Sequence, residues 1–133
     1  VFLYMALIVQ KYGGTSVGSP ERIKNVAKRV ARWKSQGHDV VVVVSAMSGE
    51  TNRLIALAKD IQSQPDPREL DVMVSTGEQV TIALLSMALL EIGVPARSYT
   101  GGQVRILTDN AYTKARIVSI DEHNMRADLK AGR

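Results

Sequence analysis

The sequence predicts an α/β fold with an open sheet of parallel strands, and three observations support this prediction. Residues 7–9 (LIV) form an apolar run that ends in polar residues, as expected for a strand buried on both faces. A glycine turn and an amphipathic helix follow, and five consecutive valines at 40–44 then indicate a central strand. The order strand, turn, helix, strand is a βαβ unit, whose strands run parallel and are joined by a right-handed crossover.

The helix of this unit is predicted to begin at Ser19-Pro20, because serine is a good N-cap and proline suits the first helical position. Gly37 is predicted to end it. Its apolar residues recur at helical spacing opposite a basic face, and they are Ile23, Val26, Val30 and Trp33. We expect Trp33 to lie in the core, together with Met73 and Met87 of a later helix.

Helices and short strands continue to alternate beyond the second strand. The predicted elements are a helix at 51–62, a helix at 67–91, strands at 96–100 and 116–120, and a helix at 123–130. The sequence QPDP at 64–67 separates the first two of these helices, and Asp66 to Glu69 has the form of a capping box. Gly101-Gly102 predicts a turn after the first of these strands.

Length and composition place the chain among ordinary globular proteins. Its 133 residues suit one domain or a piece of a larger one, and 45% of them are hydrophobic. The formal net charge is +4, but the 17 Lys and Arg are spread among 13 acidic residues, and aromatic residues make up only 5%. We therefore expect no nucleic-acid partner, and a phosphorylated or carboxylated small molecule fits this balance at least as well.

Several other classes of protein are disfavoured. The absence of cysteine excludes disulfides, thiolate metal sites and cysteine nucleophiles, and it is compatible with the cytoplasm. No stretch reaches the roughly 20 apolar residues that span a bilayer, so we expect no membrane association. His38 and His123 are isolated, so we expect both at the surface and no metal site in the chain. We interpret Met5 as the natural start and residues 1–4 as upstream or added sequence.

A glycine turn follows the first strand, in the sequence KYGGTSVGSP at 11–20. Gly13 and Gly14 permit positive φ and close backbone approach, so successive amides can point at an anion near a helix start. The spacing imitates a phosphate loop, but Ser19 stands where that motif requires lysine, and the dinucleotide motif GxGxxG is absent. A phosphate site with its cation at Lys11 and a tight turn with a surface lysine are therefore both compatible with this segment.

Polar side chains also gather after the second strand, in SAMSGETN at 45–52. Its hydroxyl and amide groups belong to Ser45, Ser48, Thr51 and Asn52. They can hydrogen-bond a carboxylate, an amine or a phosphate without adding charge. Helix capping by Ser48 or Thr51, worth about 1 kcal/mol, is the simpler explanation, but it needs only one of these side chains. Both turns are expected at the carboxyl edge of the sheet, where ligands of such sheets bind.

A third candidate is Glu78, in the sequence STGEQVTIALL at 75–85. Its surroundings are apolar, and Gly77 beside it costs about 1 kcal/mol of helix propensity relative to alanine. A carboxylate in a crowded apolar region needs a cation, so recognition of a substrate ammonium group is one interpretation. The other interpretation is an ordinary solvent-exposed glutamate, which composition alone favours.

These three segments, together with SYTGGQVRILTD at 98–109, resemble the aspartokinases of the amino acid kinase superfamily in order and spacing. The matching stretches are VQKYGGTSVGS, VVVSAMSGETN and ELDVMVSTGEQVTIALL, and the resemblance extends from Met5 to Arg133. It implies a three-layer α/β/α sandwich with a mainly parallel central sheet. It also implies a cytoplasmic enzyme that transfers the γ-phosphoryl group of MgATP to the β-carboxylate of L-aspartate, the first step towards lysine, threonine and methionine.

The resemblance also implies roles for individual residues. The family's ATP phosphate-binding motif corresponds to Lys11, Tyr12, Gly13 and Gly14, with Lys11 as the catalytic charge. The family's aspartate contacts correspond to Ser45, Thr51 and Glu78, and the glutamate holds the substrate amino group.

Family members continue beyond the matching region, through a GRGGSD-type motif, the adenine site and usually ACT regulatory domains. Residues 5–133 are therefore expected to be the N-terminal part of a catalytic domain, inactive alone, from an enzyme that forms homo-oligomers. The alternative is a non-catalytic phosphate-binding or assembly module, and sequence-independent RNA binding is a weaker third hypothesis.

Overall fold

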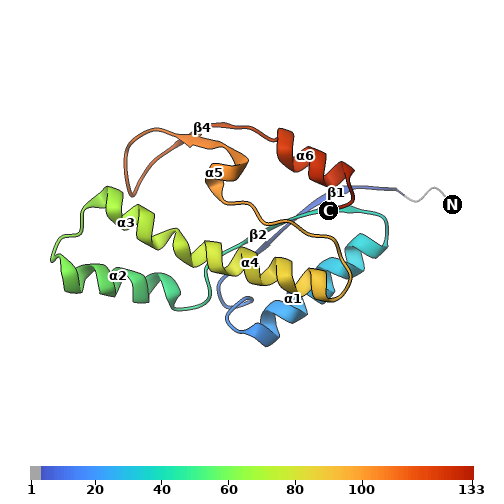
Figure 1. Ribbon diagram of the computed structural model, residues 1–133, viewed down its shortest axis with the longest axis horizontal. Helices are drawn as coiled ribbons and strands as arrows, with labels where there is room; N and C mark the ends of the chain where they lie inside the picture. The colour runs from blue at the N-terminus through green and yellow to red at the C-terminus, as the bar shows by residue number, and fades with distance from the viewer. Residues whose placement is uncertain (1–3) are drawn as a thin grey trace.

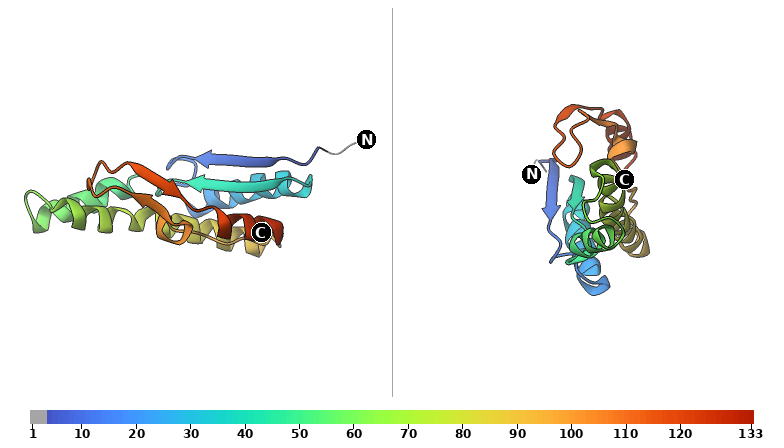
Figure 2. Two further views of the ribbon diagram at one scale, coloured as in Figure 1. Left: turned by 90° about the horizontal axis from the view of Figure 1, so that it is seen from above. Right: turned by 90° about the vertical axis from the view of Figure 1, so that its left-hand side faces the viewer.

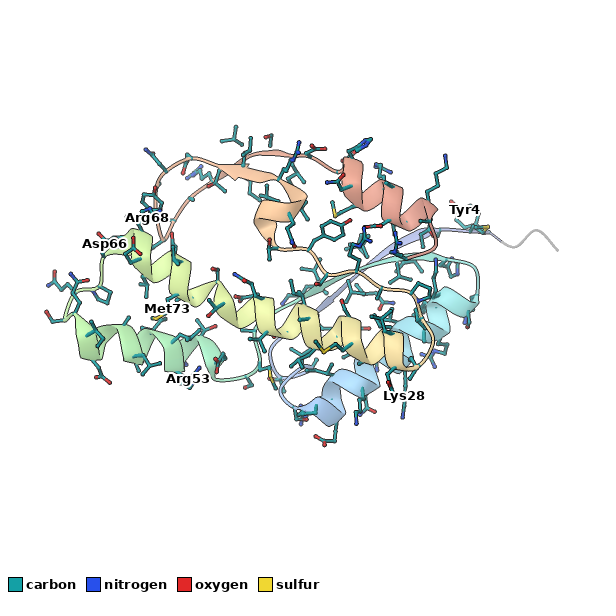
Figure 3. The ribbon with its side chains drawn as sticks, in the orientation of Figure 1. Tyr4, Lys28, Arg53, Asp66, Arg68 and Met73 are labelled. Atoms are coloured by element: carbon teal, nitrogen blue, oxygen red, sulfur yellow. The ribbon has the colours of Figure 1, made fainter. Side chains whose placement is uncertain are left out.

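The computed structural model describes residues 4–133 and confirms an α/β architecture (Figure 1). The interpretation of residues 1–4 as added sequence therefore lies almost wholly outside the described residues. The elements, in chain order, are β1 (Leu7–Tyr12), α1 (Pro20–Ser35), β2 (Asp39–Val44), α2 (Glu50–Ile61), α3 (Pro67–Val74), α4 (Thr76–Glu91), α5 (Gly101–Val104), β3 (Ile106–Thr108), β4 (Ile117–Ile120) and α6 (His123–Lys130). The molecule is elongated, with Asp66 and Arg68 at the end opposite Tyr4 (Figure 3).

β1, α1 and β2 form the predicted βαβ unit. The strands pair in parallel, and their last residues, Tyr12 and Val44, lie opposite each other. Ser19 caps α1 as predicted, because its side chain accepts a hydrogen bond from the amide of Arg22, and Pro20 is the first helical residue. The carboxyl ends of both strands therefore lie side by side, which brings together the turns that follow them.

The core lies between one face of this sheet and the helices α1 and α4. Its buried members are Tyr12, Val17, Ile23, Val26, Ala27, Val30, Val44, Leu85 and Leu89. α4 contributes one buried stripe at helical spacing, which consists of Gly77, Thr81, Leu85 and Leu89. β1 lies at the margin of the molecule in both views of Figure 2, with the rest of the chain to one side.

The prediction that the first strand is buried on both faces is wrong. Leu7 and Val9 are 52% and 64% exposed, whereas Ile8 between them is half-buried. The core contacts of α1 and α4 reach only the opposite face, and among residues 4–133 the face carrying Leu7, Val9 and Val43 stays open. β1 thus has the sequence of a fully buried strand and the burial of a half-covered one.

The helix predicted at 67–91 occurs as two helices, α3 and α4, which meet at Ser75. The hydroxyls of Ser75 and Thr76 donate to carbonyls of the preceding turn, at 2.9 and 2.6 Å. Such bonds compete with the helical hydrogen bonds and bend helices, which explains the break. The predicted start is confirmed, since the Asp66 carboxylate accepts from the amide of Glu69 at 3.1 Å.

Together α3 and α4 cover Pro67–Glu91, 25 residues that include an 18-residue window of mean hydropathy 1.4. By length and composition alone they could cross a membrane, and one such candidate is weak evidence that does not contradict the expectation of no membrane association. A core helix of a soluble protein has the same composition, and the buried stripe of α4 packs against α1.

Two residues that were expected in the core lie at the surface instead. Trp33 is 36% exposed in the last turn of α1, and its ring packs against His38 with centroids 5.9 Å apart. Met87 is 62% exposed, because it lies on the side of α4 away from the buried stripe. Met73 is half-buried.

The strand predicted at 96–100 and the turn predicted at 101–102 are both wrong. Residues 94–100 belong to no strand, and Gly101 begins α5, where Thr100 and Gln103 form a capping box. β3, which was not predicted, pairs antiparallel with β4, and the strand predicted at 116–120 and the helix at 123–130 are confirmed as β4 and α6. The described strands therefore form one parallel and one antiparallel pair instead of one mainly parallel sheet.

Side-chain bonds to Asp128 on α6 explain the course of residues 94–100. The Asp128 carboxylate accepts hydrogen bonds from the hydroxyl of Tyr99, from Arg97 at 3.1 Å and from Arg133 at 2.6 Å. The Tyr99 hydroxyl, together with the two guanidinium groups, holds the pKa of Asp128 below its usual range, and the same bond raises the pKa of Tyr99. Arg97 and Tyr99 are thereby held against α6 instead of joining the edge of β2.

Candidate functional site

A pocket of about 290 Å³ opens where β1 and β2 end, and three segments of the chain form it. They are the first turn (residues 13–18), the second turn with the start of α2 (residues 45–52), and the start of α4. The lining residues are Gly14, Ser45, Ala46, Met47, Ser48, Gly49, Thr51, Asn52 and Glu78. The structure therefore brings together all three predicted substrate residues, Ser45, Thr51 and Glu78, in a pocket near the small end of the range for ligand sites.

Backbone hydrogen bonds join the first and second turns. The amide of Ser45 donates to the carbonyl of Tyr12 at 3.1 Å, and the amide of Ser48 donates to that of Gly14 at 3.2 Å. A Cβ on Gly14 would lie 2.8 Å from the carbonyl oxygen of Ala46, so a larger residue would force the two turns apart. The close contact between the turns thus requires glycine at position 14.

Lys11 is exposed at the end of β1 and does not line the pocket. Its ammonium group lies over the first turn, 3.9 Å from the position that a Cβ on Gly13 would take. Arg22 fixes the far side of this turn, because its guanidinium donates to the carbonyl of Thr15 at 2.8 Å. The exposed Lys11 and the half-buried glycines thus form a positively charged edge of the pocket.

Tyr12, which the resemblance assigned to the phosphate-binding motif, has a buried side chain. It is 9% exposed and belongs to the core, and its hydroxyl donates to the side chain of Gln10 at 2.8 Å. Its side chain therefore anchors the end of β1 in the core, and its backbone carbonyl accepts the hydrogen bond from Ser45 that joins β1 to the second turn.

Glu78 is half-buried at the start of α4, with Ser45 and Thr51 half-buried on the other walls of the pocket. None of the ion pairs among residues 4–133 includes Glu78 or Lys11. A half-buried carboxylate without a cation is unfavourable unless a ligand supplies the positive charge. The pocket therefore combines one uncompensated carboxylate with neutral hydroxyl and amide groups.

A second carboxylate, Glu50, lies beside the pocket but is already paired. Arg53, labelled on α2 in Figure 3, donates to both carboxylate oxygens of Glu50 at 2.9 and 2.6 Å. This bidentate bond lowers the pKa of Glu50 and raises that of Arg53. Sequence reasoning missed this pair, although the spacing of three residues on a helix could have revealed it.

A larger cavity of about 650 Å³ lies between β2, α4 and the C-terminal segment. Its walls are mostly apolar, and it touches the candidate site only near Glu78. Among the described residues, no group of three or more His, Cys, Asp or Glu side chains is arranged to hold a metal ion.

The pocket thus combines a glycine turn after the first strand, a hydroxyl-rich turn after the second and a glutamate of α4, within an α/β fold. The sequence profile of the amino acid kinase family matches residues 6–133, so the chain belongs to this family.

Within the family, the chain is similar to aspartokinases. It is 74% identical to the aspartokinase of Pseudomonas aeruginosa over 129 residues, a match that covers 97% of this chain and 31% of the relative. It is 54% identical to aspartokinase 2 of Bacillus subtilis, with coverage of 97% and 32%. The chain therefore spans only about a third of the length of these relatives.

The solved structures that the chain resembles are also aspartate kinases. The aspartate kinase from Synechocystis is 54% identical, with a TM-score of 0.71 over 76% of this chain and 17% of that chain. Aspartokinase III from E. coli, solved in complex with aspartate and ADP, has a TM-score of 0.79 over 97% of this chain and 39% of that chain. Since its identity is 21%, this second similarity concerns the fold alone.

Proposed function

We propose that the chain is the N-terminal part of the catalytic domain of an aspartate kinase. This enzyme would transfer the γ-phosphoryl group of MgATP to the β-carboxylate of L-aspartate. The pocket of about 290 Å³ carries the proposal, because it surrounds the uncompensated carboxylate of Glu78 with Ser45 and Thr51. The relatives that are 70–74% identical are aspartokinases, which supports the same assignment.

The pocket suits an amino acid with its ammonium group towards Glu78. An ammonium ion neutralises that carboxylate, while the hydroxyls of Ser45 and Thr51 donate hydrogen bonds to a substrate carboxylate. The lining contains no lysine or arginine, so the cation for the second substrate carboxylate comes from elsewhere in a protein of the relatives' length.

The edge formed by Lys11, Gly13 and Gly14 suits the phosphates of ATP. The amides of Gly13 and Gly14 donate to no group among residues 4–133, and the ammonium group of Lys11 lies beside Gly13. Such amides and a lysine can hold phosphate oxygens in place. The residues therefore fit a nucleotide, although most of the adenine site would have to come from additional chain.

Catalysis in this site needs positioning and charge stabilisation rather than a general base. The β-carboxylate of aspartate is already ionised, and one of its oxygens forms a bond to the γ-phosphorus as the bond to ADP breaks. MgATP supplies the phosphoryl group, and its metal neutralises part of the phosphate charge. Lys11 stabilises the negative charge that spreads over the transferring oxygens, while Glu78 and the hydroxyls align the acceptor.

The remaining proposals concern a protein of the relatives' length. We propose that it is a cytoplasmic homo-oligomer in lysine, threonine and methionine biosynthesis, with a three-layer sandwich around a mainly parallel sheet. The open face of β1, with Leu7 and Val9 exposed, supports the third layer because it has the composition of a buried surface. We expect the 133-residue chain alone to be inactive.

The test is to measure ADP release that depends on both MgATP and aspartate, in a protein of the relatives' length that contains this segment. Glu78→Gln should raise the KM for aspartate by about 10-fold or more, since it removes an ion pair with the ammonium group. The KM for ATP should stay within about 2-fold, and Glu91→Gln at the exposed end of α4 is the control. Aspartate-independent turnover, or none, would contradict the proposal and favour the binding module.

A further inference from the structure

We propose that Gly77 is a positioning residue, which acts through Glu78 by packing on Ala46. Gly14, Ala46 and Gly77 form a close-packed stack, called here the glycine stack, that sets the separation between the first turn and Glu78. This inference rests on the proposed function, because it assigns the stack the task of holding the aspartate carboxylate in line with the phosphates.

The first contact of the stack is between α4 and the second turn. A Cβ on Gly77 would lie 2.9 Å from the Cβ of Ala46, 3.5 Å from Glu50 and 3.7 Å from Leu54. Gly77 is buried in α4 and has no positive φ, so its backbone conformation does not require glycine. Lack of space is the reason that position 77 carries no side chain.

The second contact is between the second turn and the first turn. A Cβ on Gly14 would lie 2.8 Å from the carbonyl oxygen of Ala46. Ala46 itself is only 5% exposed, packed between the two glycines. The edge formed by Lys11 lies on one side of Ala46, and the start of α4 with Glu78 lies on the other.

The rest of α4 supports this close approach. Its buried stripe has small residues, Gly77 and Thr81, near the pocket and the larger Leu85 and Leu89 against α1. Thr81 is completely buried, and its hydroxyl donates to the carbonyl of Gly77 at 3.2 Å. The first turn of α4 therefore lies close against the second turn of the chain, where glycine is a poor helix former but leaves the necessary room.

A methyl group at position 77 should displace Glu78. Carbon atoms pack at about 3.5–4.0 Å, so the contact with Ala46 at 2.9 Å would have to open by roughly 0.6–1.1 Å. Since α4 is a rigid element, this shift moves Glu78 away from Ser45 and Thr51. Misplacement by about 1 Å can cost as much as 100-fold in a catalysed reaction.

The experiment compares Gly77→Ala with a double variant in the protein of the relatives' length. Gly77→Ala should raise the KM for aspartate by on the order of 10-fold and leave the KM for ATP nearly unchanged. Ala46→Gly removes the methyl group that would clash, so the double variant Gly77→Ala, Ala46→Gly should recover most of the aspartate affinity. The matched control is Gly101→Ala in α5, where a Cβ would meet nothing within 4 Å.

Gly14→Ala gives a contrasting case. Its clash would be with the backbone carbonyl of Ala46, which Ala46→Gly does not remove, so the same second change should fail to rescue it. An unchanged KM for aspartate in Gly77→Ala, or no rescue in the double variant, overturns the inference. Glu78→Gln is measured in parallel. If Glu78 does not bind aspartate, the KM for aspartate is unchanged in that variant, and this outcome is distinct from a failure of the glycine stack.

Thermal unfolding tests the contact between Gly77 and Ala46 without a measurement of enzyme activity. Gly77→Ala should lower Tm, the double variant should restore most of the loss, and Gly101→Ala should not lower Tm. If the protein has no aspartate-dependent turnover, the proposed function fails, and the Tm comparison still decides whether the stack exists. A Gly77→Ala protein with unchanged Tm and unchanged kinetics would contradict the stack directly.

Discussion

Two charged residues distinguish the region around the pocket, Lys11 and Glu78. Neither belongs to an ion pair among residues 4–133, whereas the neighbouring Glu50 is neutralised by Arg53 at 2.6 Å. Perturbed or unpaired charges in a cleft are typical of binding and catalytic sites, because structure alone would favour pairing them. This contrast between paired and unpaired carboxylates supports the choice of Glu78 as the substrate contact.

Replacement of Lys11 tests its proposed role as the catalytic charge. Lys11→Ala should lower kcat by about 100-fold to 1,000-fold, since loss of one donor to the developing charge has effects of this size. Folding should be unaffected, because the side chain is exposed. The measurement is kcat with saturating MgATP and aspartate in the protein of the relatives' length, and the control is Lys24→Ala on the exposed side of α1. A kcat within about 3-fold of the unmodified protein would remove Lys11 from the reaction.

The sequence indicates candidate site residues more readily than their arrangement. Lys11, Gly13 and Gly14 are candidates because a glycine turn after a strand has a local signature, although a surface lysine is equally compatible with that turn. Glu78 was left between a substrate contact and a surface residue, because its surroundings depend on how α4 approaches the second turn. That approach is a tertiary contact, set by Gly77 and Ala46, which no spacing along the chain reveals.

At the scale of helices and strands, predictions succeeded where local signals were strong. Ser19-Pro20 and Asp66 begin helices as expected, since capping is a short-range interaction. The strand predicted at 96–100 does not form, because a strand depends on a partner strand. Arg97 and Tyr99 form hydrogen bonds with Asp128 instead. The fold of this segment is decided by a polar contact with a helix about 30 residues further along.

The bonds of Asp128 predict a pH-dependent attachment of α6. The pKa of Asp128 is lower in the folded chain than in the unfolded chain, so its stabilising contribution is present above its unfolded pKa and is lost as pH falls through the folded value. Asp128→Asn should therefore speed amide hydrogen exchange in residues 123–130 at pH 7. As pH falls towards the folded pKa, the difference between the unmodified and variant proteins should narrow, because the carboxylate becomes increasingly protonated.

Hydrogen exchange followed by mass spectrometry measures this difference, with both proteins compared at the same pH to cancel the intrinsic rate. Asp60→Asn is the control, since Asp60 is exposed and lies on α2, away from α6. Equal protection of residues 123–130 in the Asp128→Asn and unmodified proteins at pH 7 would show that these bonds do not hold the helix.

For the whole molecule, the sequence was sufficient to predict the α/β class and the βαβ unit. It was not sufficient to predict which faces of the sheet are covered by other elements. The apolar run at 7–9 has the composition of a strand buried on both faces, but only one face is covered among residues 4–133. What covers a face depends on elements that are distant in sequence. The exposed Leu7 and Val9 are therefore informative, because they form an apolar pair on one face of β1 before the charged Lys11, whereas exposed apolar side chains are usually isolated.

Val9→Lys should make the 133-residue chain more soluble, but it should destabilise a protein of the relatives' length. In the shorter chain Val9 is 64% exposed, so the change should raise solubility and alter stability by less than about 0.5 kcal/mol. If a third layer covers this face in the longer protein, the same change buries a charge and should destabilise it by several kcal/mol. Solubility of the shorter chain and the urea midpoint of the longer protein measure the two effects. An unchanged midpoint in the longer protein would mean that the face of β1 stays open there, and that the three-layer arrangement is wrong.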